Sequence, residues 1–334
     1  MKILIPENYK SSLNLYDTQA SISFIKKNFE EKLIKELNLK RVSAPLFVEK
    51  ESGLNDDLDG KAKAVNFIAP NINKECVIVH SLAKWKRMAL HEYGFYEGYG
   101  LYTDMNAIRK DEKLDNLHSI YVDQWDWEKV INKKDRNLEY LFCTVTIIHK
   151  CILDTLKKLK EKYPTVNTSI EKEIHFVSSQ SLITEYPNMD AKQREYEIVK
   201  KYKSVFIFGI GNDLSDGKPH DQRASDYDDW DLNGDLLYYD ELLDCPIEIS
   251  SMGIRVDEDS LAKQLQISNE EYKKDYKYHS MILNKTLPYT IGGGIGESRL
   301  CMLLMNKAHI GEVQSSIWDD ETIKTCKEKG IILL

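Results

Sequence analysis

The spacing of hydrophobic residues predicts several amphipathic helices. After Asp17, apolar side chains recur every three or four positions, as on one buried helix stripe: Ile22, Ile25, Phe29, Leu33 and Leu37. The same kind of pattern predicts a long helix over residues 136–163 and shorter ones over 81–91, 257–266 and 269–285. Further polar helical segments are expected between residues 177 and 205.

Short apolar runs between these helices predict strands, which in chain order cover 42–48, 76–80, 100–107, 119–126, 173–177, 205–210, 236–239 and 246–250. The first contains Pro45, which is tolerated on an edge strand or at an interface because its missing N–H is not needed there. The last two runs are close enough to form a hairpin. Strands that follow one another in sequence favour a largely antiparallel sheet. No repeat or linker divides the chain, so we expect one α+β domain over residues 1–334.

A glycine-rich segment near the C-terminal end is the most informative part of this pattern. An apolar run over 287–291 leads into Ile291-Gly-Gly-Gly-Ile-Gly-Glu-Ser-Arg299, and a second apolar run follows, which predicts strand, turn and helix. A dinucleotide fingerprint would need glycine where Glu297 stands, and a Walker loop would need lysine directly after Gly296. The glycines can simply ease strand–helix packing, but Arg299 beside them suits a base or a phosphate.

Composition narrows the class of protein without naming a function. The chain has 334 residues, of which 42% are hydrophobic and 30% charged, as in an ordinary globular protein. No apolar stretch is long enough to span a membrane, and the N-terminal residues lack a signal-peptide core, so we expect a cytoplasmic location. The net charge of −8 opposes binding to nucleic acid, so a polyanionic ligand would need a locally basic pocket.

The six cysteines show no C-x-x-C spacing, and most lie inside apolar runs. Reduced thiols in a protein core have this distribution. We therefore expect neither a zinc site nor disulfide bonds.

The segment from His118 to Glu128 alternates polar and aromatic residues, so as a strand it would turn its two sets of side chains to opposite faces. One face would carry Asp123, Trp125 and Trp127, and the other would carry Gln124, Asp126 and Glu128. Fixed oxygen acceptors of this kind suit an ammonium group. A polar edge that simply faces solvent is an equally good interpretation.

Two acids, Asp235 and Glu248, flank the predicted hairpin and could meet across its strands. Two carboxylates suit Mg²⁺, which takes oxygen ligands and shares them with a triphosphate. The alternative is a pair of exposed acids at strand ends. The segment from Asp229 to Asp240 also resembles a calcium loop, but glycine and proline upstream do not support the flanking helix that such a loop needs.

Five cationic residues lie next to these glycines, acids and strand ends: Lys86, Arg109, Arg223, Arg255 and Arg299. Together they would provide the pocket for phosphate and carboxylate that an acidic protein needs. Taken singly, each would more commonly be a solvated surface charge.

Long strings of residues around these positions resemble the ammonia-dependent asparagine synthetases. The strings are His80-Ser-Leu-Ala-Lys-Trp-Lys-Arg87, Tyr121-Val-Asp-Gln-Trp-Asp-Trp-Glu128, Asp226-Tyr-Asp-Asp-Trp230, Ser250-Ser-Met-Gly-Ile-Arg255 and Gly292-Gly-Gly-Ile-Gly-Glu-Ser-Arg299. That family is in turn similar to the catalytic core of class II aminoacyl-tRNA synthetases. The resemblance, from about residue 17 to 318, implies a class II synthetase-like antiparallel sheet flanked by helices, and a homodimer built around Pro45.

The resemblance also implies a reaction. L-Aspartate, ATP and ammonia would give L-asparagine, AMP and pyrophosphate through a β-aspartyl-adenylate. The chain has Lys2 where an N-terminal nucleophile glutaminase has cysteine, and no cysteine lies in a Gly-x-Cys-x-Gly elbow, so free ammonia would be the nitrogen donor.

The residues that match the family take their expected roles from it. The nucleotide would be bound by Ser119, Arg223, Asp228, Gly294 and Arg299, with Arg299 stacked on adenine. The expected Mg²⁺ ligands are Asp235 and Glu248, and Arg109 would clamp the α-phosphate and the activated carboxylate. Aspartate would be held through its ammonium group by Gln124 and Asp126 and through its carboxylates by Ser81, Lys86, Ser251 and Arg255. Asp56 would receive the incoming ammonia and help to take a proton.

Two other functions fit parts of the same pattern. One is a truncated aspartyl- or asparaginyl-tRNA synthetase paralogue, although the chain leaves little room for an anticodon-binding domain or a basic RNA-facing surface. The other is a catalytically silent dimer that binds a nucleotide and regulates a partner. The products formed from ATP, aspartate and ammonium distinguish the three.

Overall fold

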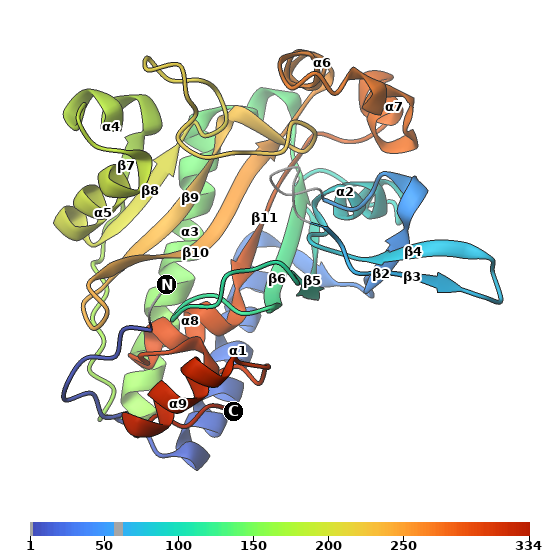
Figure 1. Ribbon diagram of the computed structural model, residues 1–334. Coiled ribbons are helices and arrows are strands. Elements are labelled where there is room, and N and C mark those ends of the chain that lie inside the picture. The colour runs from blue at the N-terminus through green and yellow to red at the C-terminus, as the bar shows by residue number, and fades with distance from the viewer. Residues whose placement is uncertain (1–2, 57–62) are drawn as a thin grey trace.

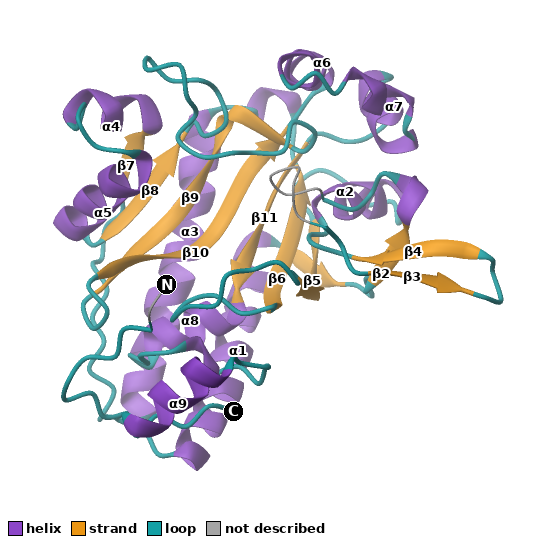
Figure 2. Ribbon diagram, in the orientation of Figure 1, coloured by secondary structure: helices purple, strands orange, loops and turns teal. Residues whose placement is uncertain are grey.

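The computed structural model describes residues 3–56 and 63–334 and contains two β-sheets within them (Figures 1 and 2). The larger, eight-stranded sheet has the order β1-β5-β6-β11-β10-β9-β8-β7. These strands are β1 Leu39–Arg41, β5 Gly100–Ile108, β6 Tyr121–Val130, β7 His175–Ser178, β8 Ser204–Phe208, β9 Asp228–Asp240, β10 Cys245–Arg255 and β11 Thr290–Gly296. The smaller sheet, of order β2-β4-β3, contains β2 Phe47–Glu49, β3 Asn66–Ala69 and β4 Lys74–Ile78. Only β1–β5 and β7–β8 pair in parallel among these strands, so the predicted antiparallel sheet is confirmed.

The α-helices connect and flank these strands. In the described residues they are α1 Leu15–Leu37, α2 Ala83–Glu92, α3 Leu138–Lys162, α4 Ser179–Glu185, α5 Ala191–Tyr202, α6 Glu258–Ile267, α7 Lys277–Leu283, α8 Glu297–Leu304 and α9 Asp320–Glu328. Within this part of the chain no helix combines the length and the apolar character needed to cross a membrane.

The main hydrophobic core lies where α1, α3 and α8 pack against one face of the large sheet (Figure 1). Phe29 of α1 lies against Trp125 of β6, with ring centroids 4.7 Å apart, and Trp127 is fully buried in the same core. Because successive side chains of a strand point to opposite faces, Gln124, Asp126 and Glu128 are turned away from this core. The predicted alternation along β6 is therefore confirmed, and it leaves the polar face for a site.

The glycine-rich segment differs from its prediction. We expected a strand over 287–291 followed by a glycine turn, but the glycines themselves form β11 and the strand runs directly into α8. β11 lies between β6 and β10, with Gly293 opposite Trp127 and Met252. A Cβ on Gly293 would come within 2.5 Å of the Met252 Cβ and 2.7 Å of the Ser251 carbonyl oxygen. The glycines are needed because neighbouring strands and side chains approach this strand closely.

Three other predictions about elements were wrong in part. The segment 42–48 is not one strand, because the chain leaves the large sheet after β1 and enters the small sheet at β2 on the far side of Pro45. The predicted helix over 269–285 is broken into a 3₁₀ turn, Glu271–Asp275, and α7. The strand predicted over 236–239 is part of the longer β9, which already begins at Asp228, and its acids Asp228 and Asp235 are buried in ion pairs.

The hairpin of β9 and β10 is confirmed and is longer than predicted. Its register shifts between Glu248 and Ser250, as at a β-bulge. An extra residue at such a point changes which side chains face each side of the sheet. Glu248 and Ser251, three positions apart, consequently line the same cavity.

Candidate active site

A cavity of about 510 Å³ lies on the polar face of the large sheet. It is lined by most of the predicted site residues: Asp56, Ser81, Arg109, Ser119, Gln124, Arg223, Asp228, Glu248, Ser251, Arg255, Gly294 and Arg299. They come from β6, β9, β10 and β11, from the start of α8, and from loops before β3, before α2, after β5 and before β9. Segments far apart in sequence therefore converge on one place.

Lys86 and Asp126 lie behind the cavity wall rather than along it. The Lys86 ammonium, on α2, forms an ion pair with Asp126 and donates to the carbonyl oxygens of Trp127 at 3.0 Å and Gly293 at 3.1 Å. Both side chains are buried. The acceptors that β6 offers to an ammonium group are thus used by a lysine of the protein itself, so the structure does not bring Lys86 and Asp126 to a ligand surface.

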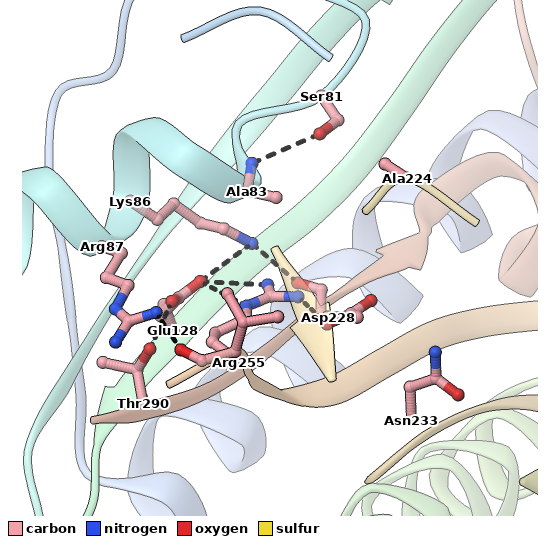
Figure 3. A network of polar contacts seen from close by, with 12 residues as sticks. Ser81, Ala83, Lys86, Arg87, Glu128, Ala224, Asp228, Asn233, Arg255 and Thr290 are labelled. Carbon is pink, nitrogen blue, oxygen red and sulfur yellow. Dashed lines mark hydrogen bonds and ion pairs between the residues drawn. The ribbon is translucent and has the colours of Figure 1, made fainter. Parts of the chain in front are cut away.

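Arg255 belongs to the cavity lining and is buried between two acids (Figure 3). Its Nε and Nη2 donate to Glu128 at 3.1 and 3.0 Å, and its Nη1 pairs with Asp228. The Thr290 hydroxyl donates to the other Glu128 oxygen at 2.8 Å. Burial opposes the charge of Arg255, but Glu128 and Asp228 outweigh it and raise its pKa. The guanidinium is a fixed positive charge.

Arg255 and Glu128 meet across Gly292 of β11. A Cβ at this position would lie 2.7 Å from the Arg255 Nη2 and 2.6 Å from a Glu128 oxygen. Gly294 plays a similar part for Gln124, because a Cβ there would collide with the Gln124 amide oxygen. The absence of side chains on β11 allows its neighbours to lean over it.

The residues predicted to bind phosphate and metal lie close together around Glu248. Arg223 pairs with Asp235, and Arg299 donates to the Glu248 carbonyl oxygen at 3.1 Å. Burial together with the charge of Glu248 raises the pKa of Asp235 to about 6, although Arg223 works against the shift. Asp235 is not part of the cavity lining, and its Oδ1 has no hydrogen-bond partner among the described residues.

The cationic side chains around Glu248 make this part of the cavity basic. Burial favours the neutral form of its carboxyl group, but four cations outweigh burial and lower its pKa: Arg299, Arg223, Lys192 and Arg109. Lys192, on α5, did not feature in the prediction because it belongs to no motif. Although the protein is acidic overall, it therefore contains the locally basic pocket that a polyanionic ligand would need.

Asp56 and Arg109 both belong to the cavity lining. The backbone of Asp56 is held by a hydrogen bond between its carbonyl oxygen and the His80 ring at 3.0 Å, and the Asp56 side chain is buried. Arg109 follows β5, and its backbone N–H donates to the Ile120 carbonyl at 2.8 Å. Its Nε is buried without a hydrogen-bond partner in the described part of the chain.

Sequence reasoning missed several residues of the cavity wall. Asp123 was placed only on the aromatic face of β6, and Ser298 was read only as part of the glycine motif, yet both line the cavity with Gln314. His118 also lines it, and its ring Nδ1 lies 2.8 Å from an Asp115 oxygen. The position of Ser298, two residues after the last glycine of the motif, was a usable signal, whereas Gln314 lies in no motif.

Substitution of Arg255 tests whether its buried ion pairs with Glu128 and Asp228 stabilise the protein. We predict that Arg255→Met lowers the free energy of unfolding by about 3–5 kcal/mol, because it leaves Glu128 and Asp228 buried without their partner. Urea denaturation measures the change. The matched control is Arg41→Met, since Arg41 pairs with Asp104 on the exposed surface and its loss should cost only about 0–1 kcal/mol. Equal, small effects of both substitutions would contradict the prediction.

Comparison with known proteins shows to which family this chain is similar. The model of the aspartate–ammonia ligase family matches residues 16–330. Aspartate–ammonia ligases from Clostridium perfringens and Ligilactobacillus salivarius are 55% and 54% identical to this chain over 336 residues, and cover all of it. The alignments include 99% and 100% of those two proteins.

Solved structures of tRNA synthetases share the fold at low sequence identity. Asparaginyl-tRNA synthetase from Pyrococcus horikoshii, complexed with asparaginyl-adenylate, is similar with a TM-score of 0.66 and 14% identity, over 89% of this chain and 68% of that one. The Entamoeba histolytica enzyme in the same type of complex gives 0.63 and 14%, over 90% and 66%. The expected class II synthetase-like fold is thus confirmed. With the full-length similarity to the ligases, it follows that the chain belongs to the aspartate–ammonia ligase family.

Proposed function

We propose that the protein amidates L-aspartate with ammonia at the expense of ATP, giving L-asparagine, AMP and pyrophosphate through a β-aspartyl-adenylate. The observation that carries this proposal is the convergence of Arg109, Arg223 and Arg299 around Glu248 in the lining of a single cavity. Gln124 and the buried charge of Arg255 lie along the same wall. A nucleotide and an amino acid can therefore meet in one pocket.

Adenylation explains why such a pocket needs cations. A carboxylate is a poor electrophile because amide formation would have to expel oxide, whereas an adenylate provides AMP as a stable leaving group. Negative charge accumulates around phosphorus as the side-chain carboxylate of aspartate attacks and pyrophosphate departs. Fixed guanidinium groups stabilise that charge more than they stabilise the ground state. We assign the α-phosphate and the reacting carboxylate to Arg109, and adenine stacking to Arg299.

Asp235 and Glu248 fit the binding of Mg²⁺ to the triphosphate. No group of three or more His, Cys, Asp or Glu side chains suited to a metal occurs within residues 3–56 and 63–334. Mg²⁺ needs only one or two protein carboxylates when phosphate oxygens and water complete its shell. The unpartnered Oδ1 of Asp235 beside Glu248 supports this assignment. When bound, the ion would neutralise phosphate charge, while Arg223 and Ser119 hold the nucleotide beside Asp228.

The aspartate end combines direct contacts with charges behind the wall. We assign direct contacts to Ser81, Gln124 and Ser251, which line the cavity. Lys86 and Asp126 are paired with each other behind that wall, so in this proposal they set the charge balance beneath the substrate. Arg255 contributes a fixed positive charge toward the carboxylates of aspartate. Gly294 lies against Gln124, so its part is to leave room for that side chain rather than to bind ATP by itself.

A complete product analysis tests the proposed function. Purified protein is incubated with ATP, L-aspartate and ammonium, and AMP, pyrophosphate and asparagine are measured together. We expect the three products in equal amounts, with none when ammonium or aspartate is omitted at multiple turnover. ADP in place of AMP would contradict the adenylate route. AMP release that requires tRNA would favour the synthetase paralogue, and no turnover of ATP would favour the silent nucleotide-binding dimer.

Asp56 is our candidate for the group that receives ammonia. We predict that Asp56→Asn lowers the rate of asparagine formation about 10²-fold, because an amide cannot take the proton that ammonia releases on attack. Aspartate-dependent exchange between pyrophosphate and ATP should remain close to wild type, since adenylate formation precedes that step. Asp111→Asn, at an exposed acid in the loop after β5, is the control. Equal loss of exchange and of amidation would show that Asp56 acts earlier.

We also propose a homodimer that uses the surface around Pro45. Leu46 and Phe47 are exposed beside it, and Phe67 and Ile68 of β3 extend the apolar surface, with the rings of Phe47 and Phe67 in edge contact. Burying such side chains in a second copy would remove them from water. Sedimentation equilibrium should give about twice the chain mass of 38.8 kDa. A single-chain mass at assay concentrations would exclude this dimer.

A further inference from the structure

Asp123 of β6 holds the start of α8 through a filled set of hydrogen bonds. Its Oδ1 accepts from the Ser298 backbone N–H at 3.2 Å and from the Gln314 amide at 3.1 Å. Its Oδ2 accepts from the Ser298 hydroxyl at 2.8 Å and from the Lys26 ammonium at 3.2 Å. Four donors from three different parts of the chain thus meet on one buried carboxylate.

Lys26 connects this carboxylate to α1. Its ammonium group lies 2.7 Å from a Glu297 oxygen and 3.2 Å from Asp123. The Glu297 and Asp123 side chains are buried, while Lys26 reaches them from the partly exposed surface of α1. Without Lys26, two neighbouring carboxylates would be left with their mutual repulsion. The lysine therefore holds together β6, α1 and the first turn of α8.

The first turn of α8 needs such support because its N-cap residue, Gly296, provides no side chain. Backbone N–H groups at a helix start have no partner within the helix and are usually satisfied by a capping side chain. Here the carboxylate of Asp123, from another strand, accepts from Ser298 instead. Arg299 is the next residue, so the direction in which its side chain leaves the helix depends on this contact.

We propose that Asp123 and Lys26 are positioning residues for the nucleotide: together they fix the start of α8 so that Arg299 faces the adenine end of the cavity. The proposal rests on the proposed function in one respect, the assignment of Arg299 to ATP. It adds Lys26, which lies outside the quoted strings, and a role for Asp123 that was not predicted, and it gives a path of contacts from α1 to the cavity. Asp123 lines the cavity and could contact ATP directly, whereas Lys26 does not line it. A substitution of Lys26 therefore distinguishes a positioning role from direct contact.

Binding of ATP, measured by calorimetry in the presence of Mg²⁺, tests the proposal without requiring turnover. We expect Lys26→Met to raise the Kd for ATP about tenfold, because a charge-assisted hydrogen bond that positions Arg299 is lost. The Kd for aspartate, measured in the same way, should change less than about twofold, since the polar contacts of Lys26 are with Asp123 and Glu297 and not with Ser81, Gln124 or Ser251. A merely structural lysine would not separate the two substrates in this way.

Lys32→Met is the matched control, because Lys32 also lies on α1 and pairs with an acid, Asp154 of α3, away from the cavity. It should leave the Kd for ATP unchanged. Ser298→Ala removes one donor to Asp123 and one acceptor for Gln314, and should weaken ATP binding even if Lys26→Met fails to fold.

The outcomes separate this inference from the proposed function. Wild-type protein that does not bind ATP would refute the proposed function, and this inference with it. Wild-type protein that binds ATP, together with unchanged affinity in a folded Lys26→Met variant, would refute the positioning role alone; if that variant does not fold, unchanged affinity in Ser298→Ala would refute it. Equal weakening of ATP and aspartate in Lys26→Met would also refute it, because a general loss of structure would then account for the change.

Discussion

Arg255 reaches from β10 across β11 to Glu128 on β6, and it does so only because Gly292 lies between them without a side chain. Placing a guanidinium and a carboxylate in a protein interior is costly unless each is paired and hydrogen-bonded. Here Glu128 also accepts from Thr290, and Arg255 also pairs with Asp228. These pairings hold the side chains of Arg255 and Glu128 in fixed positions on the polar face of the sheet.

The same constraint explains the glycine strand. A strand in the middle of a sheet normally gains stability from side chains packed on both faces, and glycine gives that up. β11 does so because Met252 approaches it from β10 and Gln124 leans over it from β6. At β11 a ligand of this cavity would consequently contact backbone atoms. The side chains that distinguish one ligand from another would come from the neighbouring strands, β6 and β10.

Much of the fold could be predicted because it depends on local periodicity. The stripe of α1 and the alternation of β6 were evident from the sequence, as was the existence of the β9–β10 hairpin. The partners of the polar residues were not. Lys86 is a plausible substrate contact when read alone, and only the approach of α2 to β6 shows that it pairs with Asp126. Asp123 was overlooked for a related reason, since its partners come from α1, α8 and Gln314.

The bulge in β10 determines which side chains of this strand face the cavity. A regular strand would send residues three apart to opposite faces, yet Glu248 and Ser251 open into the same space. One continuous strand thus contributes both Glu248 and Ser251 to the cavity lining. The spacing between these two side chains is consequently fixed by the backbone of β10, so it does not depend on the position of a loop.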